Sequence, residues 1–371
     1  MDLGIHMKES KRLAKDTRLI IVFFVAMIVS FSLWQFIRPW IAEYYYRNGY
    51  VANTYNKFKE SAVYLDKTLK LAPWETYYLI TQVKNYESLS QMTSDIKEKV
   101  RYLKMAKDLY DYMLKINPTN PWYYNGLASI YLGLSNYSED QVERKQYYED
   151  AGKAYEQAAK IDYLNPLFQM SLAYYYHRIG RVSEAYALYQ KCVELDDWFV
   201  EAYYNMAEMD LSAGNIDKAI ENFEKIATAD VQCYAPSNKT YKNWVKGGNY
   251  KHYREKLGEI YLSQNKFDLA IKYFEWALEN NKEDPKLWRS LGVSYHQARQ
   301  LERAIYAYKQ AISIDPELYD IYKYLGYVYY NVGLLNGSVE NLKKYLKVTP
   351  SDKKAQNDLS KIQSILNSSG R

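Results

Sequence analysis

The chain has little cysteine, glycine and proline for its length. Among 371 residues there are 2 cysteines, Cys192 and Cys233, together with 15 glycines and 9 prolines. Two cysteines are too few for a disulfide framework, and they lack metal-ligand spacing. The redox compartment, and whether Cys192 and Cys233 form a disulfide, stay open. Because turn-forming residues are scarce, we expect an all-α chain with long or numerous helices.

Histidine is also scarce, and the motifs of common catalytic sites are missing. The four histidines are scattered, and none lies in a His-Glu-x-x-His spacing. The sequence has no glycine-rich phosphate loop and no Gly-x-Ser-x-Gly elbow. We therefore expect no enzymatic activity, no cofactor and no metal, and we interpret Cys192 as a core residue, not a nucleophile.

Positive charge is not concentrated in a stripe. The formal net charge is +5, and the first 41 residues hold six lysines or arginines against three acidic residues, so the remainder is close to neutral. A nucleic-acid-binding protein needs a basic patch to neutralise phosphates. This charge pattern predicts no nucleic-acid partner.

One long apolar run stands near the N-terminus. Residues 19–37 carry no charge and are bounded by Arg18 and Arg38. As a helix this run would be about 28 Å long, close to the hydrocarbon thickness of a bilayer, and Trp34 and Trp40 lie near its end, where such rings prefer the headgroup layer. We expect a transmembrane helix at 19–37.

The charges around this run predict its orientation. The basic segment 1–18 precedes it, so the positive-inside rule places that segment in the cytoplasm and the rest of the chain outside a cell (inner) membrane, on the periplasmic side. Two alternatives remain. Ser30-Phe31-Ser32 has the form of a signal-peptidase site, and cleavage there would release a soluble adaptor beginning at Leu33. A buried core helix is the other, which the basic flank and the tryptophans disfavour.

A repeating pattern of 34 residues covers most of the chain. In residues 285–316 a first helix has a large residue, a Leu-Gly pair and a tyrosine on one face. A second helix follows with an alanine, an aromatic residue and another alanine on one face, and it ends at a proline. The same frame recurs before and after this unit. The positions of this unit are Trp288, Leu291, Gly292, Tyr295, Ala304, Tyr308, Ala311 and Pro316.

These residues resemble the tetratricopeptide repeat. The resemblance implies a right-handed superhelical solenoid of eight helix hairpins over residues 42–352, with units that start at 42, 76, 121, 166, 200, 251, 285 and 319. An apolar stripe at 353–366 predicts a capping helix, with Ser351 as its N-cap. Only Pro39 and its neighbours separate the span from the first repeat, so we expect the repeats close to the membrane.

Three features depart from the repeat. Units two and three are each 45 residues long, and we expect their eleven extra residues mostly in the second helices. The unit at 200 carries a long loop with aromatic and lysine residues, in which Tyr241 and Trp244 are candidates for partner contact. Asp210 occupies a position that is tyrosine in most other units, where a buried unpaired carboxylate would be costly.

Binding in this family uses the concave face of the first helices. The resemblance places eleven candidate partner-binding residues there: Tyr46, Tyr50, Tyr77, Trp122, Tyr174, His177, Tyr204, Arg289, His296, Lys323 and Tyr327. The N-terminal part of this set is aromatic, which suits an extended peptide or a sugar ring. The lysine and asparagine pairs of the carboxylate clamp found in chaperone-binding relatives are not matched, so that function is not implied.

We expect a membrane-anchored extracytoplasmic scaffold that binds a protein or peptide partner through its groove. The alternative is the C-terminal repeat domain of a glycan-polymerising enzyme, because residues 19 to about 75 are similar to the end of O-antigen ligase and polymerase-like proteins. The catalytic part of such an enzyme is absent from this chain. The partner, the oligomeric state and whether the chain is a piece of a longer protein stay open.

Overall fold

The computed structural model describes residues 2–233 and 252–369, and the side chains among them except those of 2–17, 229–233, 280 and 369. These residues form seventeen α-helices and no strand. The chain divides into two compact units, Met1–Arg181 and Val182–Arg371. Each unit is a stack of antiparallel helix hairpins in which every helix packs mainly on its neighbours in the sequence. The expected all-α solenoid architecture is confirmed.

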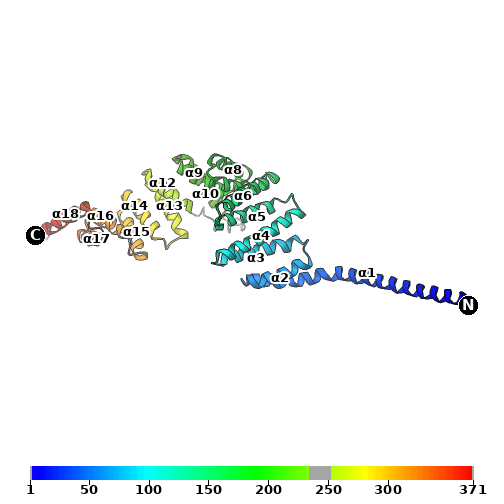
Figure 1. The fold of residues 1–371 in the computed structure, drawn as a ribbon. Helices are drawn as coiled ribbons and strands as arrows, with labels where there is room; N and C mark the ends of the chain where they lie inside the picture. The colour runs from blue at the N-terminus through cyan, green and yellow to red at the C-terminus, as the bar shows by residue number, and fades with distance from the viewer. Residues whose placement is uncertain (1, 234–251, 370–371) are drawn as a thin grey trace. The chain divides into compact units, whose positions relative to one another are not determined.

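Unit 1 contains seven helices, which Figure 1 shows in blue to green. They are α1 (Asp2–Thr54), α2 (Phe58–Leu71), α3 (Thr76–Met92), α4 (Ile96–Ile116), α5 (Pro121–Tyr137), α6 (Gln141–Ile161) and α7 (Pro166–Arg178). The first helices α3, α5 and α7 begin at the residues from which the sequence repeats were counted. Asn120 and Asn165 cap α5 and α7 through backbone N–H groups of Trp122 and Leu167, just before a proline at the first helical position.

The helix α1 runs without a break from the apolar segment into the first hairpin. We expected residues around Pro39 to separate the two, but Pro39 lies inside the helix. A proline removes one backbone hydrogen bond and destabilises a helix interior by about 3 kcal/mol. The helix does not end here, because the residues on both sides of Pro39 favour a helical conformation. The side chains of residues 19–37 are exposed, and the first buried one on α1 is Ala42.

The two longer hairpins gain length in both of their helices. The helices α3 and α5 have 17 residues and α4 and α6 have 21, whereas the regular hairpin of α14 and α15 has 13 and 14. The first helix thus gains four residues, about one turn, and the second gains seven, about two turns. Whole turns keep the buried face of each helix in phase, and most of the extra length lies in the second helices, as expected.

Unit 2 contains ten described helices, drawn in green to red in Figure 1. They are α8 (Val182–Leu195), α9 (Val200–Ser212), α10 (Ile216–Cys233), α12 (Tyr253–Ser263), α13 (Phe267–Asn280), α14 (Pro285–Gln297), α15 (Leu301–Ile314), α16 (Tyr319–Asn331), α17 (Leu335–Val348) and α18 (Lys353–Ser369). Gly180, Gly214 and Gly333 have φ between 77° and 80°. This left-handed conformation favours glycine and allows the tight turns that follow α7, α9 and α16.

In four hairpins a glycine of the first helix meets a large residue of the second. In the hairpin of α14 and α15, Gly292 lies against the ring of Tyr308, which is fully buried. A Cβ atom at 292 would lie 2.6 Å from two ring carbons, so only glycine fits. Such contacts join into one apolar cluster in each unit. The signature residues are therefore packing residues first.

The last helix, α18, covers the end of the α16–α17 hairpin. Its Ala355 and Ile362 are buried and pack on α17. We expected Ser351 to be the N-cap, but Asp352 caps the helix instead. Its Oδ1 accepts a hydrogen bond from the backbone N–H of Ala355 at 3.0 Å. Asp352 is favoured because a carboxylate also interacts with the helix dipole.

Candidate partner-binding surface

Polar contacts join four of the described first helices to the hairpin before them. In four hairpins the signature tyrosine donates its hydroxyl proton to a carboxylate in the preceding second helix. The pairs are Tyr86 with Asp66 at 3.0 Å, Tyr176 with Glu156 at 2.9 Å, Tyr261 with Glu224 at 2.6 Å, and Tyr295 with Glu275. Burial first, and then the bond to Glu275, raises the pKa of Tyr295 to about 12. These pairs hold the first helices in place but lie outside the predicted binding set.

Asp210 takes the tyrosine position in α9, and its partners are reversed. The carboxylate is 4% exposed and accepts from the hydroxyl of Tyr186 at 3.0 Å and from the amide of Asn222 at 3.1 Å. The acid thus comes from the first helix and the tyrosine from the second helix before it. The departure noted in the sequence is compensated by these donors and does not leave an unpaired buried charge.

Three predicted residues, Tyr46, Tyr50 and Tyr77, lie together at the start of unit 1. The ring centroid of Tyr46 is 6.1 Å from that of Tyr50, 5.2 Å from Tyr77 and 4.8 Å from Tyr78. We call Tyr46, Tyr50, Tyr77 and Tyr78 the N-terminal tyrosine cluster. Its outer rings are open to solvent, because Tyr50 is 51% and Tyr77 is 57% exposed.

The inner part of this cluster is held by charged neighbours. The hydroxyl of Tyr78 donates to Glu43 at 2.9 Å, and the guanidinium of Arg47 donates to the other oxygen of that carboxylate at 2.9 Å. Burial and the bond to Glu43 raise the pKa of Tyr78 to about 12, while the bond from Arg47 lowers the pKa of Glu43. Tyr78 was not among the predicted residues, although the pair Tyr77-Tyr78 in the sequence marks it.

Tyr46 itself is almost fully buried beneath the other rings. Its exposure is 6%, and burial raises the pKa of its hydroxyl. Hydrogen bonding to Tyr77 raises this pKa further, and hydrogen bonding to Thr81 lowers it. The cluster therefore combines open aromatic faces with a buried hydroxyl.

The other predicted residues of unit 1 do not join this cluster. Trp122 is 53% exposed and stands edge-on to Phe168 at 4.8 Å. Tyr174 is 51% exposed, with the guanidinium of Arg178 6.0 Å from its ring centre, and His177 is exposed. These residues form separate exposed positions on α5 and α7.

In unit 2 the predicted polar residues are already engaged by the next first helix. Arg289 pairs with Asp320 at 3.0 Å, and His296 contacts Asn331 at 3.1 Å. Burial lowers the pKa of His296, which favours its neutral form. Tyr204 is half-buried, with its ring edge-on to Phe223. The polar groups of Arg289 and His296 therefore join neighbouring hairpins and are not free to bind a partner.

The last two predicted residues contact the capping segment. Lys323 pairs with Asp352 at 2.7 Å, and the hydroxyl of Tyr327 donates to Asp358 at 3.1 Å. Both carboxylates lie in or just before α18, in the place that a further first helix would take. The predicted loop residues Tyr241 and Trp244 lie outside the described residues.

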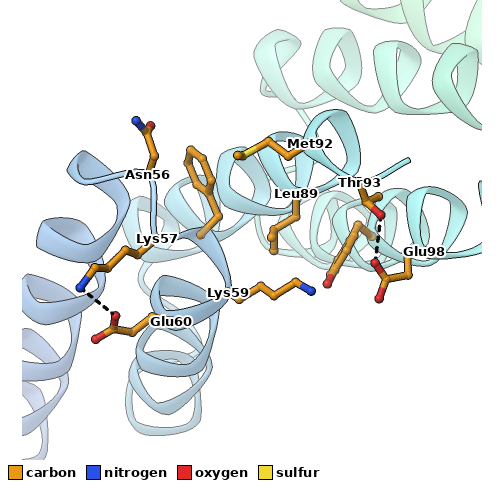
Figure 2. Close-up of a pocket in the computed structure, with 10 residues that line it drawn as sticks. Asn56, Lys57, Lys59, Glu60, Leu89, Met92, Thr93 and Glu98 are labelled. Atoms are coloured by element: carbon orange, nitrogen blue, oxygen red, sulfur yellow. Dashed lines mark hydrogen bonds and ion pairs between the residues drawn. The ribbon is translucent and has the colours of Figure 1, made fainter. Parts of the chain in front are cut away.

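An open pocket of about 460 Å³ lies beside the turns 55–57 and 93–95 (Figure 2). Its apolar walls come from Phe58, Leu89, Met92 and Tyr102, and charged groups surround them. Lys57 pairs with Glu60 at 3.7 Å, and the hydroxyl of Thr93 donates to Glu98 at 3.0 Å. Sequence reasoning missed this pocket because it forms only where two hairpins meet.

The described residues contain no cluster of three or more His, Cys, Asp or Glu side chains that could hold a metal. Burial raises the pKa of the Cys192 thiol to about 12, so it is not a thiolate near neutral pH. Cys192 is fully buried in α8, as expected for a core residue. The described surface residues are suited to binding.

Comparison with known proteins identifies the repeats. Residues 142–197 and 255–318 match one tetratricopeptide-repeat family model, and residues 200–230 match another. The chain therefore contains tetratricopeptide repeats, as their signature predicted. Among solved structures, the C-terminal part of a tetratricopeptide repeat-containing protein from Cytophaga hutchinsonii is similar, with 18% identity and a TM-score of 0.52 over 76% of this chain and 98% of that one. This likeness concerns the fold alone.

Curated relatives match over short regions. The BBSome complex member BBS4 of Bos taurus is 26% identical over 176 residues, which are 47% of this chain and 30% of the relative. The peroxisomal targeting signal receptor of Candida glabrata is 30% identical over 86 residues, which are 23% of this chain and 15% of the receptor. This chain thus spans less than a third of the length of either relative.

Proposed function

We propose that this chain is a membrane-anchored scaffold, with its tetratricopeptide repeats on the extracytoplasmic side, and that it binds an extended peptide segment of a protein partner. The partner lies on the N-terminal tyrosine cluster. The single observation that carries the proposal is that two exposed tyrosine rings, of Tyr50 and Tyr77, pack beside the buried Tyr46 on the helix that continues from the apolar segment.

The argument for anchoring rests on the exposed part of α1. Of the described helices, α1 is the one that is long and apolar enough to cross a membrane by length and composition. None of its apolar segment is buried in the protein. Thirteen leucine, isoleucine, valine and phenylalanine side chains in 19–37 would otherwise face water, which is unfavourable.

The proposed sidedness rests on charge. Basic residues are dense before the apolar run and sparse after it, which favours the cytoplasm for the N-terminal segment. The repeats would then lie outside. A cleaved signal segment would place them on the same side of the membrane but without an anchor.

The argument for a peptide rests on the difference between the two units. In unit 2, Arg289 and Lys323 are paired with carboxylates of the protein itself. In the N-terminal tyrosine cluster, rigid rings with hydroxyl tips are open, and such rings give large contact area at low entropic cost. A peroxisomal targeting signal receptor among the relatives is in keeping with a protein partner.

A photo-reactive amino acid at position 77, in intact cells, tests this proposal. The matched control is position 306, because Tyr306 is 58% exposed, against 57% for Tyr77, and lies on a second helix in unit 2. We expect a discrete extracytoplasmic protein attached at 77 and absent at 306, through an extended segment identified by mass spectrometry.

The additional change Tyr50→Ser is expected to remove this product without a change in the amount of chain in the membrane. Equal products at both positions, or attachment to cytosolic proteins only, would contradict the proposal. A sugar adduct at 77 in place of a peptide would assign the cluster to a glycan and would contradict the peptide.

A further inference from the structure

We propose that the turn between α2 and α3, residues 72–75, is a second membrane contact, and that its Trp74 lies in the headgroup layer of an anionic phospholipid bilayer. This inference rests on the proposed membrane anchoring of α1. It adds that the bilayer also holds the first hairpin, so that the repeats do not swing freely on one helix.

Direct contacts place this turn beside the end of the apolar run. The side-chain N–H of Arg38 donates to the carbonyl oxygen of Leu71, the last residue of α2. The guanidinium carbon of Arg38 lies 4.3 Å from the centre of the Trp74 ring. Arg38 is the first charged residue after the uncharged segment 19–37. The turn is therefore level with the point at which α1 leaves the hydrocarbon.

The thickness of a bilayer then sets the surroundings of the turn. Each headgroup layer is about 5–7 Å thick beyond a hydrocarbon core of about 30 Å. Arg38 follows residue 37 by one helical rise, about 1.5 Å. If residues 19–37 span the core, both Arg38 and the Trp74 ring that it contacts lie within this layer.

The exposed groups at this level suit phospholipid headgroups. Trp74 is 51% exposed and Trp40, on α1, is 71% exposed. Tryptophan rings prefer the membrane interface, where an apolar body and a polar N–H are both satisfied. Lys70 is exposed in the last turn of α2, close to the phosphate level. Glu75 is the one carboxylate in the turn 72–75.

Two further lysines, in the same position of the next two hairpins, add positive charge on this side of unit 1. Lys70, Lys115 and Lys160 each lie in the last turn of a second helix, at intervals of 45 residues, and all are exposed. The turns that follow them lead into α3, α5 and α7. Of the opposite turns, 55–57 contains Lys57, whereas 93–95 and 138–140 contain Asp95, Glu139 and Asp140. On the side of the turn at Arg38, Lys70, Lys115 and Lys160 favour an anionic surface.

This contact would determine where a partner binds. The helix α1 is continuous from the apolar run to Thr54, so Tyr46 lies about 12 Å beyond Arg38 along the helix. With the turn 72–75 in the headgroup layer, the N-terminal tyrosine cluster is held just above the membrane surface. A partner must then present its segment close to the bilayer.

Fluorescence quenching in nanodiscs tests the contact. The full chain is reconstituted into discs of phosphatidylcholine and phosphatidylglycerol, with lipids brominated near the top of the acyl chains as the quencher. The variant is Trp74→Phe, and the control is Trp198→Phe, another tryptophan of an inter-helix turn, 40% exposed, in unit 2. We expect Trp74→Phe to remove about a third of the lipid-quenched emission, because Trp34 and Trp40 supply the rest. Trp198→Phe is expected to leave it unchanged.

The possible results separate this inference from the proposed function. Quenched emission that is the same in the wild type and in Trp74→Phe would overturn the contact and leave the anchor intact. A wild-type chain that shows no lipid quenching would overturn the anchor and the contact together. Circular dichroism of both variants, expected to match the wild type, shows that neither change unfolds the repeats.

Discussion

Asp210 accepts a hydrogen bond from the hydroxyl of Tyr186, with 3.0 Å between the oxygens, in the place where other hairpins have a tyrosine that donates to an acid. The bond again joins a tyrosine hydroxyl to a carboxylate, but here the carboxylate lies in the first helix and the tyrosine in the second helix before it. In the hairpin before it, Tyr176 of the first helix donates to Glu156 of the preceding second helix. Both arrangements join consecutive hairpins through one charge-assisted bond.

Replacement of this tyrosine is expected to loosen the contact locally. In Tyr186→Phe the buried Asp210 loses one donor and keeps Asn222, which costs about 1 kcal/mol. Native-state hydrogen exchange should show amides of α8 and α9 opening about fivefold more often. The control Tyr330→Phe removes an exposed hydroxyl and is expected to change nothing. Unaltered exchange in Tyr186→Phe would show that the bond does not stabilise the junction.

A glycine in the first helix is expected to be irreplaceable by alanine. Gly292→Ala would place a Cβ atom 2.6 Å from Cδ1 and Cε1 of the buried Tyr308. Overpacking costs about 1–3 kcal/mol and exceeds the gain of about 1 kcal/mol in helix propensity. We expect a lower midpoint of thermal unfolding.

Gly133→Ala is the matched control for that change. Its Cβ would lie 3.2 Å from the flexible end of Leu103, which can move by a few tenths of an ångström. We expect an equal or higher midpoint than in the wild type. A higher midpoint for Gly292→Ala as well would contradict the close contact between Gly292 and Tyr308.

The contact between Lys323 and Asp352 predicts a dependence of stability on pH. The bond from Lys323, then that from the backbone of Ala355, holds the pKa of Asp352 well below its usual value, near 4 in an unfolded chain. A group whose pKa is lowered by folding stabilises the fold above its unfolded pKa, and this stabilisation is lost as the pH falls through the folded pKa.

The variant Asp352→Asn isolates this effect. It should have a lower thermal midpoint than the wild type at pH values above about 5, and the difference should narrow progressively below about pH 4. Thermal unfolding across this range is the measurement. A difference that stays constant down to acid pH would show that the charge of Asp352 does not stabilise the end of the solenoid.

The sequence predicted the features that recur within one repeat. Helix starts at Pro121, Pro166 and Pro285 follow from a proline after a capping residue, and the closure of a hairpin by a glycine follows from pairs such as Gly292 and Tyr308. These are local rules of backbone and volume, so they can be recognised within one unit.

Features between hairpins were harder to predict. Tyr46 was predicted to face a partner, yet it is buried, because Tyr77 and Tyr78 of the next first helix cover it. Lys323 was predicted as a binding residue, and it pairs with Asp352 of the capping segment. Both outcomes depend on how far one hairpin is rotated against the next, and the repeat signature carries no information about that angle.

The sequence pattern also did not predict that α1 is continuous through Pro39. Pro39 indicated an interruption, but a proline costs only one hydrogen bond and some crowding, and the residues around it form a helix on both sides. The result matters for function, because a continuous helix transmits the direction of the apolar segment to the first hairpin.

The central claim, that the repeats lie outside a membrane crossed by α1, is tested most directly by labelling of single cysteines on either side of the apolar run. The chain carries Cys233→Ser, and its remaining native cysteine, Cys192, is fully buried. Position 10 is changed in one variant, Ser10→Cys, and position 55 in another, Tyr55→Cys, where the native side chain is 74% exposed. An impermeant maleimide is added to spheroplasts. We predict that Tyr55→Cys is labelled at once and that Ser10→Cys is labelled only after the membrane is permeabilised; labelling of Ser10→Cys alone, or of both variants in sealed spheroplasts, would contradict the account.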